Sequence, residues 1–89
     1  MIKSVRIKVV GKVQHVGFRY FTALEAKKLS IMGFVKNESD GSVLIEAVGM
    51  EGNIDLFCLS VKKGPFWARV DRIQIQDIPV QEYKRFLVK

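Results

Sequence analysis

The sequence predicts an α+β sandwich in which an antiparallel sheet is covered on one face by two helices. Three observations carry this prediction: strand-like alternation near both ends of the chain, two segments with helical spacing of apolar residues, and a hairpin signal between them. The chain has 89 residues, of which 48% are hydrophobic, enough for one core. We therefore expect residues 1–89 to form a single domain.

The first third of the chain predicts a strand followed by a helix. Between residues 5 and 9, valine and isoleucine alternate with arginine and lysine, which is the period of a strand that buries one face. From about Phe18 to about Leu29, apolar residues recur at helical spacing while charged residues fall on the other side. We expect Gly33 to end this helix.

A β-hairpin is predicted next. Residues 34–38 and 42–48 have the composition of strands, and Ser39, Asp40 and Gly41 lie between them. An Asp-Gly step is a strong signal for a tight turn between antiparallel strands.

The second half predicts another helix and two more strands. Between residues 54 and 61, apolar residues occupy positions i, i+3, i+4 and i+7, which predicts a helix with Cys58 in the core, and a Gly-Pro step ends it. Strands are expected over about 69–75 and 83–88. The order β-α-β-β-α-β with a terminal strand is typical of the split βαβ, or ferredoxin-like, arrangement.

The run GKVQHVGFR, residues 11–19, joins the first predicted strand to the first predicted helix. A turn that feeds a helix N-terminus directs unsatisfied N–H groups and the positive end of the helix dipole at one small volume. Arg19 adds a permanent cation whose forked donors suit a phosphate group. The run is not a Walker A loop, because five residues rather than four separate its glycines. It predicts an anion site of another kind.

Composition narrows the classes of function. The net charge of +6 is concentrated in residues 1–36, which hold eight basic residues and one acidic residue. A positive field attracts small anions, and it attracts nucleic acid equally well. A solvated basic face without a partner is the third interpretation of the charge.

No stretch approaches the roughly 20 apolar residues of a membrane span, and the first residues lack the features of a signal peptide. We therefore expect a cytoplasmic protein without a membrane partner. Cys58 is the only cysteine and His15 the only histidine, so an internal disulfide is excluded and a metal site is not expected.

Two segments of the chain form motifs. Gly11–Arg19 fits the pattern G-x-V-Q-G-V-x-F-R except at His15, and Gly33–Val43 fits the pattern G-[aromatic]-V-x-N-x-x-D-G-x-V. Together they resemble the two signatures of the acylphosphatases, small enzymes that hydrolyse carboxyl-phosphate mixed anhydrides. The resemblance covers nearly the whole chain, and the two motifs stand at the expected separation.

The resemblance implies a ferredoxin-like fold and the hydrolysis of small acyl phosphates to a carboxylate and orthophosphate, without a metal or an organic cofactor. The Arg19 guanidinium would hold the phosphoryl group, and Asn37 on the neighbouring strand would orient the attacking water. Such a site needs no strong general base, because the leaving carboxylate is weakly basic. The phosphoryl group would also be held by the amides of Gln14, His15, Val16, Gly17, Phe18 and Arg19.

Two residues depart from the family pattern. His15 stands where the family usually has glycine, a position that can require a positive φ. Its imidazole is either exposed on the loop or part of the pocket, and a loop distorted here would bind anions without turnover. Ser30 replaces the usual glycine at the end of the first helix.

Structural alternatives stay open for single residues. A structural Arg19 would pair with a carboxylate, and a structural Asn37 would lie in a turn. Thr22 either supports the site or bonds to its own helix. Trp67 is either an exposed turn residue or a lid on the core.

An alternative function is a non-catalytic ferredoxin-like anion- or RNA-binding module, since the same element order serves RNA recognition. The predicted strand 42–48 offers no aromatic ring for base stacking, so nucleic acid is the less favoured partner. We expect a monomer that takes a small acyl phosphate as substrate and holds orthophosphate or a similar anion in the loop.

Overall fold

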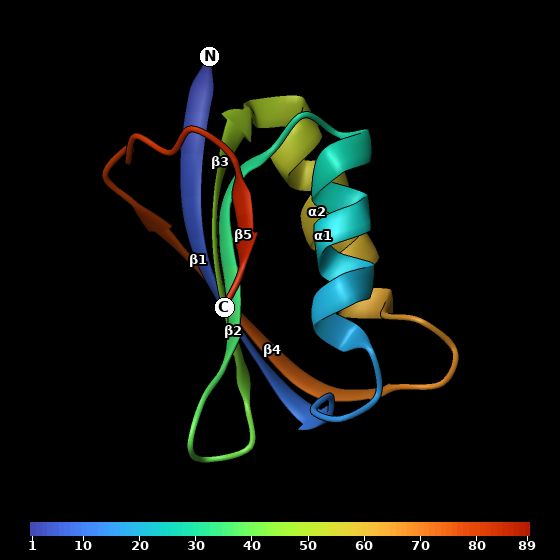
Figure 1. Cartoon of the computed structure of the whole chain (residues 1–89). Coiled ribbons are helices and arrows are strands. Elements are labelled where there is room, and N and C mark those ends of the chain that lie inside the picture. The colour runs from blue at the N-terminus through green and yellow to red at the C-terminus, as the bar shows by residue number, and fades with distance from the viewer.

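Seven elements follow one another along residues 1–89 of the computed structural model. Figure 1 shows both helices on the same face of the sheet, as the sequence predicts. Neither helix is long and apolar enough to cross a membrane. The elements are β1 (Ile2–Lys12), α1 (Phe18–Lys28), β2 (Met32–Asn37), β3 (Val43–Met50), α2 (Glu51–Lys63), β4 (Arg69–Ile78) and β5 (Phe86–Val88).

The strands are ordered β4-β1-β3-β2-β5. The first four form the ferredoxin-like arrangement predicted from the element order, with each pair antiparallel. The prediction of a wholly antiparallel sheet is wrong, because β5 pairs in parallel with β2. A chain that turns back after β4 must run in the direction of β1, and β2 has that same direction. The sheet is therefore mixed.

The boundaries of α1 lie within one residue of those predicted, but the predicted terminator of the helix and the predicted length of the last strand are wrong. The helix ends at Lys28, and Ser30 takes the left-handed conformation with φ 55°. The prediction that Gly33 ends this helix is wrong, since Gly33 lies inside β2. The fifth strand is shorter than predicted, because only Phe86–Val88 pairs with the sheet.

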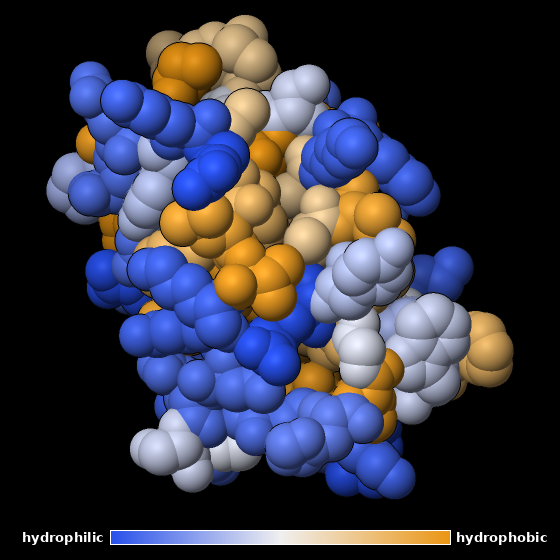
Figure 2. Space-filling model, viewed as in Figure 1, coloured by the Kyte–Doolittle hydropathy of each residue, from blue (hydrophilic) through white to orange (hydrophobic).

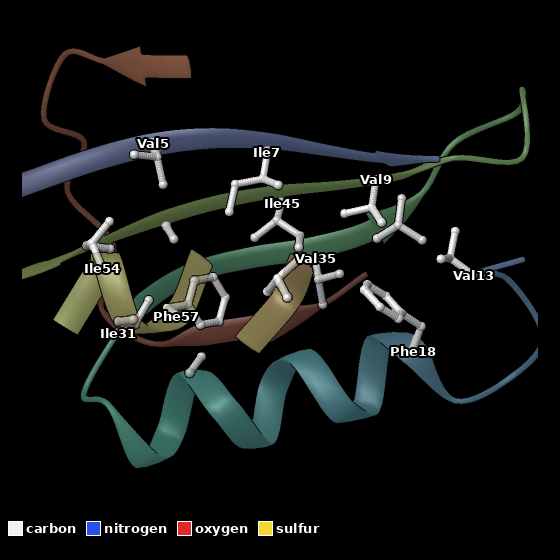
Figure 3. Packing of buried hydrophobic residues seen from close by; sticks show 14 residues of the cluster. Val5, Ile7, Val9, Val13, Phe18, Ile31, Val35, Ile45, Ile54 and Phe57 are labelled. Atoms are coloured by element: carbon white, nitrogen blue, oxygen red, sulfur yellow. The ribbon is translucent and has the colours of Figure 1, made fainter. Parts of the chain in front are cut away.

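The core lies between the sheet and the two helices. Figure 3 shows side chains of β1, β2 and β3 pointing toward the helices, and Phe18 on the first turn of α1 pointing back toward the sheet. Each fully buried side chain of this size contributes about 1.5–3 kcal/mol. Cys58 is half-buried and packs against the core, and burial raises the pKa of its thiol. The core therefore fixes the residue at which α1 begins.

Gly33 lies where β2 approaches β3 most closely. Its φ is +139°, which L side chains rarely adopt, and a Cβ atom there would overlap the main-chain oxygen of Glu46. Its N–H donates to the Arg85 oxygen at 3.0 Å, so the residue also ties β2 to the chain that leads into β5. The atoms that a Cβ would meet belong to the main chain of β3, so they cannot move aside without disturbing the sheet.

We expect Gly33→Ala to lower the free energy of unfolding by at least about 3 kcal/mol, because the side chain meets main-chain atoms on a strained backbone. Gly52→Ala is the matched control, since a Cβ there meets nothing within 4 Å and the residue lies in α2. The control substitution should raise the free energy of unfolding by about 0.5 kcal/mol. Urea denaturation measures both, and equal stability of the two variants would contradict the assignment.

Candidate functional site

The segment between β1 and α1, with the first turn of α1, carries main-chain N–H groups that no protein acceptor satisfies. Among the hydrogen bonds formed outside the regular elements, none is donated by the N–H groups of residues 14–20. The first such bond runs from the Phe21 N–H to the Gly17 oxygen at 3.0 Å. No side chain caps α1, and no acidic residue lies in its first turn. These free donors and the helix dipole favour an anion at one place.

Two residues in the left-handed conformation shape this loop. Gly17 has φ 76° and His15 has φ 62°. Alternation of right- and left-handed residues turns successive N–H groups toward one concave side. A side chain in this conformation costs roughly 1–2 kcal/mol, so His15 adopts the conformation of a glycine at a moderate cost. The His15 side chain is exposed at the rim of the cavity.

A cavity of about 180 Å³ lies between the loop, the start of α1 and the end of β2. Its volume equals that of roughly six water molecules, which suits a small anion. It contains residues of both sequence motifs, whereas the predicted site residues Gln14 and Val16 do not line it. The lining residues are Val13, His15, Gly17, Phe18, Arg19, Tyr20, Asn37 and Val88.

Arg19 reaches the cavity from the first turn of α1. Its guanidinium donates one hydrogen bond, from Nη1 to the main-chain oxygen of Lys89. It takes part in none of the seven salt bridges of the protein, so it pairs with no aspartate or glutamate side chain. The remaining donors of its planar fork are free to bind an anion.

Asn37 is the last residue of β2, where it pairs with Val43 of β3. It therefore lies at a strand end and not within the turn. Its Oδ1 atom is buried and accepts no hydrogen bond from any protein group. An unsatisfied buried acceptor costs about 1–3 kcal/mol, and Asn37 is a lining residue of the cavity, which makes its side chain the candidate to bind a group placed there.

Gln14 holds the loop to the β2–β3 hairpin. Its Nε2 donates to the main-chain oxygens of Glu38 and Ser42, each at 2.8 Å. The sequence motif indicated that Gln14 belongs to the site, but gave no signal that its side chain links the two motifs. This link positions the free N–H groups of the loop relative to Asn37.

Val13, Tyr20 and Val88 line the cavity and were missed by the sequence analysis. A signal existed for Tyr20, which falls off the apolar face of the predicted helix directly after Arg19. None existed for Val88, because its place depends on the parallel pairing of β5 with β2.

Two open alternatives are resolved by the contacts. Thr22 is buried and its hydroxyl donates to the Phe18 oxygen at 2.9 Å, so it bonds to its own helix. Trp67 is half-exposed, and its Nε1 atom would lie 3.7 Å from a Cβ built on Gly17. The indole is thus beside the loop.

No group of three or more histidine, cysteine, aspartate or glutamate side chains lies close enough together to hold a metal ion.

We expect Gln14→Ala to lower the free energy of unfolding by about 1–3 kcal/mol, because two hydrogen bonds between the loop and the hairpin are lost. Gln74→Ala is the matched control, since Gln74 is exposed on β4 and its side chain forms no hydrogen bond. Urea denaturation of both variants measures the difference. Equal free energies of unfolding for the two variants would show that the hydrogen bonds of Gln14 do not stabilise the fold.

Asp40 makes the hairpin sensitive to acid. Hydrogen bonds from the Ser42 hydroxyl and the Ser42 N–H, and then from Lys8, hold the pKa of its carboxyl well below the ordinary value. A lowered pKa in the folded state contributes stability above the unfolded value, near 3.9, that is lost as the pH falls below it. We expect Asp40→Asn to lose less stability than the wild type between pH 5 and pH 2, measured by urea denaturation. Parallel pH profiles of the two proteins would contradict this.

Comparison with known proteins shows the family of the chain. The family model described as Acylphosphatase matches residues 5–88. An acylphosphatase of Oceanobacillus iheyensis is 44% identical over 90 residues, 99% of each chain. One of Archaeoglobus fulgidus is 45% identical over 85 residues, 96% of each chain.

Solved structures give the same result. The crystal structure of acylphosphatase from Bacillus subtilis matches with a TM-score of 0.94 and 39% identity, over 100% of this chain and 99% of that chain. Full-length HypF in the phosphate- and nucleotide-bound form matches with a TM-score of 0.93 and 36% identity, over 100% of this chain and 12% of that chain. The chain therefore belongs to the acylphosphatase family and is an acylphosphatase enzyme.

Proposed function

We propose that the chain hydrolyses the carboxyl-phosphate bond of small acyl phosphates to a carboxylate and orthophosphate. The loop amides of residues 14–19 and the Arg19 guanidinium bind the phosphoryl group, and Asn37 orients the attacking water. The observation that carries this proposal is that Asn37 lines the same cavity as Arg19 and the start of α1, while its Oδ1 has no protein donor. A water molecule that donates to this atom satisfies it.

Phosphoryl binding rests on the free donors. The N–H groups of residues 14–20 have no protein acceptor, and they surround the start of α1. Arg19 adds a charge that no aspartate or glutamate side chain neutralises. As charge on the equatorial oxygens changes in the transition state, donors already in place stabilise it without reorganisation. HypF, a structural relative, has been solved in a phosphate-bound form, which supports phosphate as the ligand class.

The water attacks the phosphorus in line with the departing acyl group. Asn37 accepts a hydrogen bond from this water through Oδ1. The hydrogen bond directs a lone pair of the water oxygen at the phosphorus without removing a proton from the water. The carboxylate leaving group is a weak base and leaves without a strong acid. His15 at the rim is therefore not required for the reaction.

The alternative of an RNA-binding module finds little support on the open face of the sheet. Arg6 pairs with Glu46 at 2.9 Å, and Lys8 pairs with Asp40 at 3.0 Å. Phe34 is only 8% exposed, and the Lys89 ammonium lies 4.1 Å from its ring centroid. Bases would have no free ring on which to stack. The single domain, the cytoplasmic location and the monomeric state stay predictions from the sequence.

We expect Arg19→Ala and Asn37→Ala each to lower kcat/KM for acetyl phosphate by roughly 10²- to 10³-fold, because each removes an interaction made with the reacting groups. Arg85→Ala is the matched control, since Arg85 is exposed and lines a different hollow. Release of orthophosphate in the presence of a chelator is the measurement, and the chelator should have no effect.

Full activity of Arg19→Ala would overturn the mechanism. An inactive wild type that gains turnover on His15→Gly would instead support the anion-binding domain. Wild-type turnover that disappears with the chelator would require a metal that the mechanism does not use.

A further inference from the structure

Two exposed aromatic side chains stand beside the cavity without a role in the core. Tyr20 lines the cavity and is 68% exposed, and its hydroxyl forms no hydrogen bond. Trp67, on the segment between α2 and β4, is 52% exposed. The neighbouring Phe66 is 94% exposed and packs edge-on against Trp67, with ring centroids 5.0 Å apart. Large rings held in water next to a site indicate a surface for an apolar ligand group.

Trp67 lies beside Gly17, one of the residues that line the cavity. The Trp67 Nε1 atom is the only heavy atom of a residue outside the loop within 4 Å of a Cβ built on Gly17. In Figure 1 the segment between α2 and β4 passes beside the loop that precedes α1. Figure 2, in the same view, shows pale and tan side chains projecting from the lower right of the surface, beyond the charged blue groups.

The direction of departure points the acyl group toward this surface. In-line displacement places the leaving group opposite the attacking water, and the proposed water lies at Asn37 on the β2 side. An acyl group that leaves away from Asn37 leaves toward the other lining residues, among which Gly17 and Tyr20 come from the loop and the start of α1. The cavity of about 180 Å³ accommodates the phosphoryl group and leaves little room for a ring.

We propose that Tyr20 and Trp67 form a platform for the acyl group, so that the enzyme prefers acyl phosphates with an aromatic or extended apolar acyl group over acetyl phosphate. This inference rests on the proposed function. The platform contacts the part of the substrate that the loop and Arg19 do not touch, and it therefore determines specificity rather than the chemical step. Phe66 packs edge-on against the indole.

The test compares kcat/KM for benzoyl phosphate and for acetyl phosphate. We expect the wild type to favour benzoyl phosphate, and Trp67→Ala and Tyr20→Ala each to lower the ratio roughly two- to tenfold, the range measured for aromatic pairs. Trp67→Phe should keep most of the preference. Leu59→Ala is the control, because Leu59 is an exposed apolar residue of α2 outside the cavity, and its ratio should equal that of the wild type.

Inhibition by orthophosphate separates the platform from the loop. The inhibition constant should be the same in Trp67→Ala and the wild type, because orthophosphate has no acyl group. If orthophosphate inhibits Trp67→Ala more weakly, and by the same factor as the loss in kcat/KM for benzoyl phosphate, the indole only supports the loop. That result would overturn the proposal. An unchanged benzoyl-to-acetyl ratio in both alanine variants would overturn it as well. If the wild type hydrolyses neither substrate, the proposed function itself fails.

Fluorescence gives a second readout that needs no variant, since Trp67 is the only tryptophan of the chain. Benzoylphosphonate, which has a carbon–phosphorus bond and is not hydrolysed, should change the emission in a saturable way, and orthophosphate should reverse the change. Acetylphosphonate should give a smaller change. Equal responses to the two phosphonates would contradict contact between the indole and the acyl group.

Discussion

The site depends on a link between two segments that cannot hold themselves in place. The loop before α1 leaves its N–H groups without protein partners, so hydrogen bonds of its own backbone do not fix its shape. Gln14 supplies the missing restraint by donating to two main-chain oxygens of the hairpin. The turn of this hairpin begins directly after Asn37, the last residue of β2. The Gln14 side chain thus sets the distance between the anion-binding donors and Asn37, the residue proposed to hold water. A shift of the loop or of the hairpin would separate these groups.

The rest of the fold supplies the rigidity that this arrangement requires. Phe18 is buried in the core beside the exposed face of the same helical turn, so the next residue, Arg19, is held at the cavity. The site also contains features that lower stability, namely His15 in the left-handed conformation and the unsatisfied Asn37 Oδ1. Fourteen buried residues between sheet and helices offset these costs. Such local costs beside a well-packed core are typical of a functional site.

The residue pattern could predict most of the fold because its signals are local. Alternation in β1, helical spacing in α1 and the Asp-Gly turn each lie within one segment. The parallel pairing of β5 could not be predicted this way, since it depends on where the chain returns after β4. Gly33 does not terminate α1, because Ser30, directly after the helix, takes a conformation usually associated with glycine. In the site, the motifs identified Arg19 and Asn37, whereas the position of Trp67 beside Gly17 is a tertiary contact without a local signal.

The donors proposed to bind the phosphoryl group are mostly main-chain amides, and this affects how the sequence can change over generations. Exchange of most side chains in the loop leaves an amide N–H in place, and only proline removes one. The exposed His15 is therefore free to change in identity so long as the backbone keeps its path, whereas Val16 packs against the core. Selection at this loop acts on backbone conformation, which explains how a histidine can occupy a glycine position without the loss of a single donor.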